Sequence, residues 1–275
     1  MFVSKKLVFT ELHKTGGTHI CNCLSKLVGG EQRGKHNRIP QELWDRFILG
    51  SIRNPWDWYV SLWAFGCGGK GSVYGQTTRR LDWRYLSRQL HSEMGQRRIK
   101  PAQWVRQFRH DICKPVAAWR KTYKDSADYK AFRDWLSLIL NFDRRFDMGE
   151  GVGFSLISNS FGLMTYRAMK LFTTIGNQLY SDPGLSSLQG LNRAWKEKRL
   201  VDFVIRNELL EQDLIQALHH AGIPISESEI SALFSAPDNR TNASKRLPAG
   251  YYYDEATKAL VARREQFIIE AFGYK

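Results

Sequence analysis

The chain has 275 residues, of which 43% are hydrophobic and 25% charged, and its formal net charge is +14. This length and composition are typical of a globular protein of one domain, or two at most, and we expect a single domain over residues 1–275. A chain this basic attracts polyanions, but no known DNA- or RNA-binding signature occurs in it, so we expect no nucleic-acid partner.

Targeting and redox features favour a cytoplasmic protein. No apolar run reaches the roughly 18 residues that span a bilayer. The chain enters a predicted strand within a few residues, which leaves no room for a signal peptide. No two cysteines form a Cys-x-x-Cys pair, so we expect free thiols in a reducing compartment and no metal site. The four cysteines are Cys21, Cys23, Cys67 and Cys113.

The stretch from Lys6 to Ile20 predicts a strand, a short loop and the start of a helix. It opens with an apolar run, and residues 20–28 favour a helix. Between them, Lys14–Thr18 (Lys-Thr-Gly-Gly-Thr) has the composition of an anion cradle, because glycines let the backbone approach a ligand and helix N-termini attract phosphate or sulfate. Two alternatives stay open, an ordinary Gly-Gly turn and a solvated Lys14. The order of lysine and glycines differs from a Walker A loop.

A second unit of the same kind follows. Pro40–Trp44 favours a short helical piece, and Arg46–Ile52 predicts a strand. Arg53-Asn54-Pro55 stands at the carboxyl end of that strand, because proline suits the first turn of a helix, and Ser61 then lies two turns into the helix. Two such units side by side form the carboxyl edge of a parallel sheet, where ligands bind in open α/β folds. For Arg53 alone, an ion pair with Asp57 or a capping role is the alternative.

Together the two motifs resemble the nucleotide-binding motifs of sulfotransferases that use PAPS (3′-phosphoadenosine 5′-phosphosulfate). Lys14–Thr18 after a strand resembles their 5′-phosphosulfate loop, and Arg53-Asn54-Pro55 with Ser61 resembles their 3′-phosphate site. The loop is most similar to that of carbohydrate sulfotransferases, including the heparan sulfate 2-O and 6-O types and their bacterial relatives. The resemblance implies an α/β fold with a three-layer P-loop-like core, a parallel sheet flanked by helices, and helical insertions on the acceptor side.

The middle of the chain carries little of this resemblance. Residues 66–80, rich in Gly, Ser and Thr, predict a mobile loop that is either a lid over the acceptor or a disordered excursion. Residues 82–125 are basic and form either a positive rim for an acidic acceptor or a solvated helix face. Helices are predicted over 129–140 and 159–172, and a loop over 176–191. The expected core faces of these helices are Phe132, Trp135, Leu136 and Ile139 in the first and Phe161, Met164, Ala168 and Phe172 in the second.

The last third adds a strand, helices and a basic loop. Val201–Arg206 predicts a strand, residues 208–220 a helix, and the Ser226–Glu229 spacing a capping box. Residues 239–246 form a polar basic loop, and residues 254–272 predict one long helix. The segment 202–213, and the Asn-x-Ser loop with the last helix, also resemble late segments of the bacterial sulfotransferases.

The resemblance implies roles for named residues. Sulfuryl transfer depends chiefly on positioning and on charge stabilisation. Lys14 would neutralise the leaving phosphate, and Arg53 would bind the 3′-phosphate through two N–H groups, with the Ser61 hydroxyl beside it. The other cofactor-binding residues are expected in the loop and are Thr15, Gly16, Gly17, Thr18 and His19. No metal is required by this arrangement.

A base must also take the proton of the acceptor hydroxyl, and histidine suits this task near neutral pH. Sulfotransferases of the heparan type carry their proposed catalytic histidine between the two nucleotide motifs. His36 occupies that interval here, so we expect it to be the base. Many relatives have proline where this chain has His13, which makes His13 an alternative base, and Glu11 is the nearest carboxylate.

The sequence thus favours a PAPS-dependent sulfotransferase that modifies a hydroxyl-bearing acceptor, expected to be a glycan, acidic or neutral, and releases PAP. Two alternatives stay open: a nucleotide kinase or NTPase that uses the same cradle, and a non-catalytic polyanion-binding module. Neither the acceptor nor the oligomeric state follows from the sequence.

Overall fold

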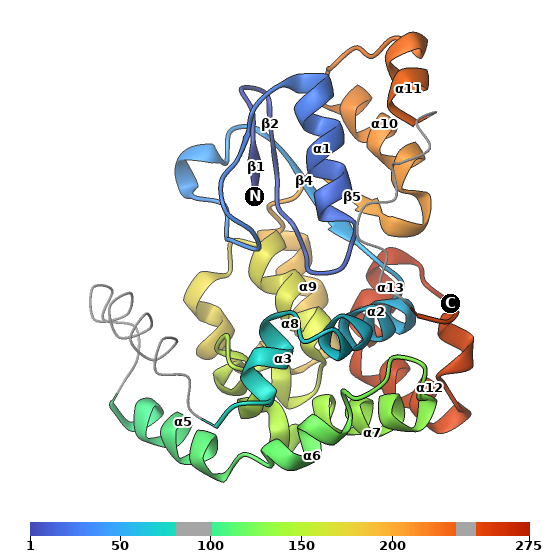
Figure 1. Ribbon diagram of the computed structural model, residues 1–275. Coiled ribbons are helices and arrows are strands. Elements are labelled where there is room, and N and C mark those ends of the chain that lie inside the picture. The colour runs from blue at the N-terminus through green and yellow to red at the C-terminus, as the bar shows by residue number, and fades with distance from the viewer. Residues whose placement is uncertain (81–100, 235–245) are drawn as a thin grey trace.

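The computed structural model describes residues 1–80, 101–234 and 246–275 (Figure 1). The strands are β1 (Phe2–Val3), β2 (Leu7–Phe9), β3 (Glu31–Gln32), β4 (Phe47–Ile52) and β5 (Phe203–Arg206). The first helices are α1 (Gly17–Val28), α2 (Pro55–Cys67), α3 (Ser72–Thr77), α5 (Pro101–Cys113), α6 (Val116–Lys121) and α7 (Tyr129–Ile139). The later ones are α8 (Leu163–Phe172), α9 (Leu188–Lys198), α10 (Leu210–His220), α11 (Glu227–Phe234), α12 (Glu255–Arg264) and α13 (Gln266–Phe272).

Five strands form one mixed sheet in the order β3-β1-β2-β4-β5. The strands β2, β4 and β5 are parallel, with Phe9 opposite Leu49 and Leu49 opposite Phe203. The expectation of a parallel sheet is therefore correct for these strands and wrong for the edge. There β1 pairs antiparallel with both β2 and β3. The reason is the short turn between β1 and β2, closed by the N–H of Ser4 on the carbonyl of Leu7, since so short a connection joins only antiparallel strands.

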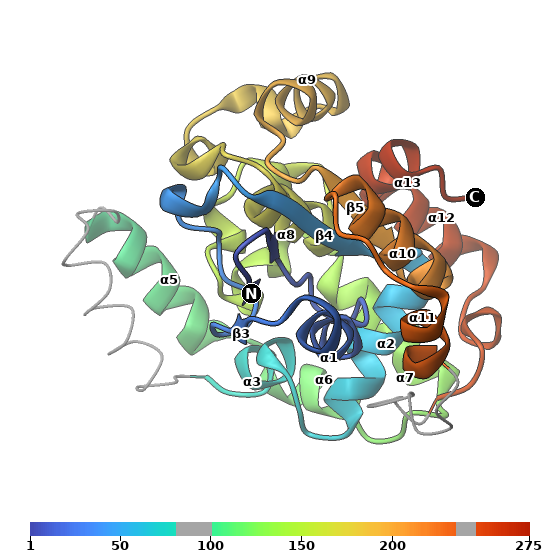
Figure 2. The same cartoon turned by 90° about the horizontal axis from the view of Figure 1, so that it is seen from above.

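Helices cover both faces of this sheet. Side chains alternate between the two faces along each strand, and here both faces present apolar residues that the helices bury. Leu7, Phe9 and Leu49 belong to a buried cluster with residues of α1 and α10. Val8 and Ile48 point the other way, into a larger cluster that contains much of α2, α7, α8 and α9. Figure 2 shows α1 and α9 on opposite sides of β4. The chain is thus an α/β protein with a sheet between helical layers.

Most of the predicted elements near the two motifs are confirmed. Strands β4 and β5 and the helix α10 lie within or close to their predicted ranges, and a 3₁₀ turn spans Gln41–Leu43. The Asn54 side chain caps α2 by accepting from the N–H groups of Trp56 and Asp57, with Pro55 in the first turn. Ser226 and Glu229 form the expected capping box. The predicted core faces of α7 and α8 are buried.

Three predictions about irregular segments are wrong. Residues 66–80 contain the end of α2 and all of α3, and small residues there allow close packing: a Cβ on Gly66 would lie 2.4 Å from the Tyr123 ring. The predicted loop 176–191 contains 3₁₀ turns at Gly176–Tyr180 and Pro183–Ser186 and the start of α9. The long helix 254–272 is divided into α12 and α13 at Glu265. Residues 82–100 and 239–245 lie outside the described residues, so the interpretations given to them stay predictions.

Glu265 explains the division of the last helix. Its carboxylate is fully buried and accepts hydrogen bonds from the N–H groups of Met164 and Thr165 at the start of α8, and from the hydroxyls of Thr165 and Tyr59. A carboxylate at a helix N-terminus satisfies N–H groups that have no partner within the helix. The chain therefore leaves helical geometry at Glu265, and one side chain joins α8, α2 and the C-terminal helices.

No helix in the described ranges is long and apolar enough to cross a membrane.

Candidate functional site

The two sequence motifs meet at the carboxyl edge of the sheet. The parallel strands β2 and β4 are neighbours, so the loop after β2 and Arg53 after β4 leave the sheet on the same side. A terminal nitrogen of Arg53, Nη1, donates to the carbonyl oxygen of Lys14 at 3.2 Å. Two segments that are 39 residues apart in the chain thus form one site.

Thr15 fastens the first loop to β4. Its hydroxyl donates to the carbonyl of Leu12 at 2.7 Å and lies 2.7 Å from the hydroxyl of Ser51. Because a hydroxyl has a single proton, Ser51 must be the donor to Thr15. Thr15 is fully buried. Its hydroxyl therefore holds the loop in place and is not available to bind a nucleotide.

The two glycines of the loop are required by packing within the chain. Gly16 is the N-cap of α1 with φ +81°, a left-handed conformation that favours glycine, and a Cβ there would lie 2.7 Å from a methyl carbon of Leu210. A Cβ on Gly17 would lie 2.8 Å from a carboxylate oxygen of Glu11. The first turn of α1, which begins with Gly17, Thr18 and His19, contains no acidic residue. The N–H groups of a first helical turn have no acceptor within the helix and can bind an anion.

A cluster of cations surrounds this edge. The Lys14 ammonium lies 4.0 Å from the centre of the Phe65 ring. Burial, together with the nearby charges of Arg53 and Arg246, lowers the pKa of Lys14 to about 8. Arg246 comes from the C-terminal part of the chain and donates to Asp57 at 2.6 Å. We call Lys14, Arg53, Arg246 and Asp57 the cation cluster.

Asp57 holds the two arginines of this cluster together. One oxygen of its carboxylate accepts from Nε of Arg53 at 2.5 Å and also contacts Nη2, while the other accepts from Arg246. The simple alternative for Arg53, an ion pair with Asp57, is therefore present in the structure. A second carboxylate, that of Glu208, accepts from the N–H of Asn54 at 2.7 Å. Three cations thus face two carboxylates, which leaves an excess of positive charge.

His36 and His13 stack beside the loop, with ring centroids 3.5 Å apart and an angle of 15° between the planes. Nδ1 of His36 lies 3.0 Å from the carbonyl oxygen of Glu11. A carbonyl oxygen only accepts, so Nδ1 must carry the proton, and Nε2 of the neutral ring has a free electron pair. Burial lowers the pKa of His36, which keeps the ring neutral near pH 7. His36 thus has the protonation state of a general base.

His13 has a different environment. Its carbonyl oxygen accepts from the indole N–H of Trp58 at 2.5 Å. Its Nδ1 is buried and has no hydrogen-bond partner within the described residues. Burial, followed by the charge of Arg167, lowers the pKa of His13 to about 2. A group this weakly basic does not take a proton near neutral pH, so the geometry favours His36 over His13 as a base.

An ion pair between Glu150 and Arg167 lies near both imidazoles and contributes to the pKa shift of each. Arg167 is buried and donates from Nε and Nη2 to the two oxygens of Glu150, at 3.0 and 2.7 Å. Burial opposes ionisation of Glu150, but the Arg167 charge outweighs it and brings the pKa of that carboxyl to about 2. The pair is therefore charged at all ordinary pH values.

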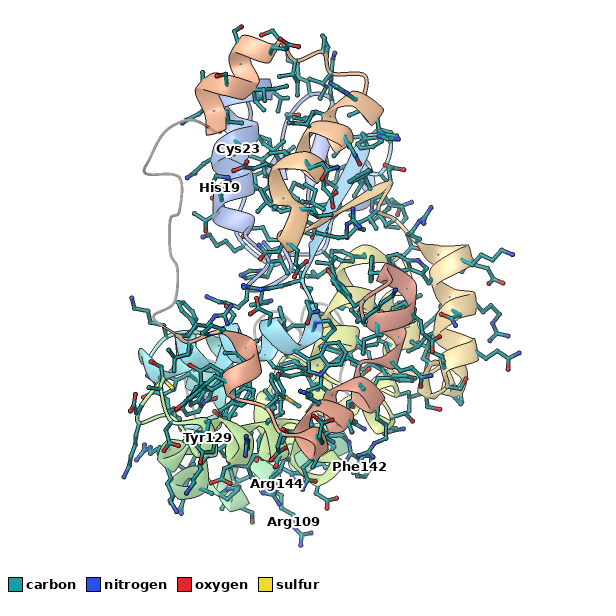
Figure 3. All side chains as sticks on the ribbon, turned by 90° about the vertical axis from the view of Figure 1, so that its right-hand side faces the viewer. His19, Cys23, Arg109, Tyr129, Phe142 and Arg144 are labelled. Atoms are coloured by element: carbon teal, nitrogen blue, oxygen red, sulfur yellow. The ribbon has the colours of Figure 1, made fainter. Side chains whose placement is uncertain are left out.

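Two expected site residues are placed less favourably. The imidazole of His19 lies on α1 with Nε2 3.5 Å from the Cys23 sulfur, one turn further along the helix (Figure 3). Its ring therefore faces along α1, and only its backbone N–H belongs to the first turn. Ser61 is buried on α2, and within the described residues it makes no hydrogen bond to Arg53 or Lys14. The Glu11 side chain accepts from Gln32 at 2.8 Å, and Glu11 acts on His36 through its backbone carbonyl and through its charge, which raises the pKa of His36.

Other residues of the site escaped the sequence interpretation. Arg246 lies 189 residues from Asp57, and no local pattern connects them. For Trp58, the sequence showed only an aromatic residue in a predicted helix. Arg167 and Glu150 lie in segments that predict core and turn, respectively. Asp57 alone had a readable signal, its spacing of four residues from Arg53, which is typical of a helical ion pair.

A shallow surface pocket of about 370 Å³ borders the second motif. Its lining includes Asn54, Trp56, Tyr253 and Lys258. The Tyr253 hydroxyl donates to the carbonyl of Trp56, which fixes one wall. The lining does not include Lys14 or Arg53, so the pocket lies beside the cation cluster and not within it.

Comparison with known proteins identified no matching family model, no matching curated protein and no matching solved structure. All four cysteines are free thiols, as expected. In the described part of the chain, no group of three or more His, Cys, Asp or Glu side chains is arranged to hold a metal ion.

The environment of Lys14 can be tested by its titration. Acetic anhydride reacts with the free amine, so we expect acetylation of Lys14 to reach half its maximal rate near pH 8, as measured by mass spectrometry of the modified peptides. The exposed Lys5 in the same protein provides the reference profile. If the two lysines show the same dependence on pH, Lys14 does not lie in the cation cluster as described.

Proposed function

We propose that the chain is a sulfotransferase that moves a sulfuryl group from PAPS to a hydroxyl group, with a carbohydrate as the expected acceptor. One observation carries the proposal: the Arg53 guanidinium donates to the Lys14 carbonyl at the carboxyl edge of β2 and β4. The two motifs that resemble the two phosphate sites of PAPS enzymes therefore lie together, at a distance that one nucleotide can span. In this proposal the parallel strands β2, β4 and β5, each followed by a helix, correspond to a P-loop-like core.

The 5′ end of the nucleotide would bind at the start of α1. The first-turn N–H groups and the Lys14 ammonium supply donors and positive charge there. An anion beside Lys14 would raise the pKa of its ammonium again, because the charged form is then favoured. Of the loop residues, Gly17 contributes a first-turn N–H group, while the Thr15 hydroxyl is committed to Leu12 and Ser51.

The 3′-phosphate would bind at Arg53. A guanidinium has five N–H groups. Two of those in Arg53 point to Asp57 and one to the Lys14 carbonyl, which leaves one N–H on each terminal nitrogen. Arg246, held by the same carboxylate, adds a further charge. The role of the Ser61 hydroxyl in this site stays a prediction, because Ser61 is buried in α2.

The chemistry needs charge stabilisation and a proton acceptor. When bound, PAPS supplies a sulfuryl group linked to the 5′-phosphate. Lys14 places positive charge where that phosphate becomes a leaving group. His36 has its electron pair on Nε2 and takes the proton that the acceptor hydroxyl loses as its oxygen bonds to sulfur. After the transfer His36 is an imidazolium and PAP carries the electrons of the broken S–O bond.

The nucleotide part of the proposal predicts a thermal shift. We expect PAP to raise the melting temperature of the protein, since a ligand that binds the folded state stabilises it. Arg53→Ala should abolish this shift, while Asp57 keeps Arg246 as its partner. Arg33→Ala is the matched control, because Arg33 is exposed and, within the described residues, its side chain pairs with Glu31. Without a shift at millimolar PAP the proposal fails, and a shift with ATP and Mg²⁺ in its place would favour the kinase alternative.

The catalytic part predicts a separation of binding from turnover. We expect His36→Ala to bind PAP like the unaltered protein and to lose turnover by a factor in the range of about 10²–10⁴, the usual contribution of a general base. Turnover is measured with labelled PAPS against a panel of glycans, and PAP binding by thermal shift. Full turnover in this variant would assign the proton transfer to another group.

A further inference from the structure

We propose that His13 is a positioning residue, whose ring face fixes the plane of the His36 imidazole so that Nε2 keeps one direction in the site. This inference rests on the proposed function, in which His36 takes the acceptor proton. It concerns a position where this chain departs from the sulfotransferases that it resembles, since His13 stands where many of them have proline.

Two contacts of different kinds act on the His36 ring. The hydrogen bond from Nδ1 to the carbonyl of Glu11 lies at 3.0 Å and sets the direction of one ring atom. Taken alone, it allows the ring to turn about the line that joins Nδ1 to the oxygen. The stacked His13 ring, 3.5 Å away at centroid and tilted by only 15°, restricts that rotation.

The backbone of His36 supports a fixed orientation. Its φ is +57°, in the left-handed region that residues other than glycine seldom adopt. Such a conformation persists where surrounding contacts impose it. The carbonyl of Glu11 and the ring of His13 are two contacts that hold the side chain of this residue.

His13 is itself held firmly and offers its ring face. The Trp58 indole anchors its carbonyl. Since Nδ1 of His13 is buried without a partner in the described chain, this nitrogen orients nothing by hydrogen bonding. The contact that reaches His36 is the flat ring. An aromatic ring of similar shape should therefore replace His13, whereas a side chain without a flat face should not.

The charges around the pair agree with this division of roles. The charges of Glu11, Arg167 and Glu150 shift the pKa of His36. Those of Arg167, Glu150 and Lys170 shift the pKa of His13. Burial keeps His13 neutral, with its pKa at about 2. A neutral ring can remain stacked on an imidazolium, whereas two protonated rings at 3.5 Å would repel each other. His36 can therefore take a proton without losing the contact.

The test compares His13→Phe, which keeps a flat ring, with His13→Leu, which fills similar volume without one. Carbon-13 NMR relaxation of labelled histidine reports the motion of the His36 ring, with its signal assigned from the spectrum of His36→Ala. We expect a rigid His36 ring in the unaltered protein and in His13→Phe. We expect His13→Leu to keep the Nδ1–H bond to the Glu11 carbonyl but to show increased ring motion, with turnover lowered about tenfold, a fraction of the general-base effect, and PAP binding unchanged.

Two results would overturn the inference. One is a rigid His36 ring and full turnover in His13→Leu. The other is a His13→Phe variant as impaired as His13→Leu, because the imidazole nitrogens and not the ring face would then matter. The NMR result does not need activity. If the unaltered protein shows no turnover with PAPS, the proposed function fails, while the spectra still decide whether His13 orients His36.

Discussion

The concentration of positive charge at one edge of the sheet is the constraint on which the site depends. Lys14, Arg53 and Arg246 come from three distant parts of the chain, and Asp57 contacts both arginines. Burial lowers the pKa values of both Lys14 and Arg53; the charges of Arg53 and Arg246 lower that of Lys14 further, whereas Asp57 partly restores that of Arg53. An anion bound beside these cations would favour their charged forms.

The imidazole pair stands next to this edge but has a different electrostatic character. Glu150 neutralises much of the Arg167 charge, and burial keeps both rings neutral. The loop after β2 contributes to both groups, because His13 of the imidazole pair and Lys14 of the cation cluster are adjacent in the chain. Lys14 has a left-handed φ of +62°.

The sequence allowed the parts of the fold with local signals to be predicted. Alternation and β-branched runs located β4 and β5, and Pro55 after Asn54 located the start of α2. Composition misled where small residues pack closely, as Gly66 does against Tyr123, and where a remote carboxylate divides a helix, as Glu265 does. The antiparallel edge was missed because β1 has only two residues, too few to show a period.

The candidate site, like the fold, could be predicted only in part. The sequence placed Lys14, Arg53 and His36 in adjacent segments, and the structure brings the first two into contact. The sequence predicted that Thr15 and His19 bind the nucleotide. In the structure the Thr15 hydroxyl bonds to Ser51, and the His19 ring lies beside Cys23. Arg246 and Arg167 could be assigned to the site only from the fold, because long-range pairing leaves no periodic pattern in one sequence.

The central claim is that this edge binds a nucleotide phosphorylated at both ends. The most direct measurement is a pair of calorimetric titrations of the unaltered protein, one with PAP and one with 5′-AMP, at pH 7 and the same ionic strength. The account predicts that PAP binds at least about tenfold more tightly, a difference of about 1.4 kcal/mol, because only PAP carries a phosphate for Arg53. Equal affinities, or no heat of binding with PAP, would contradict it.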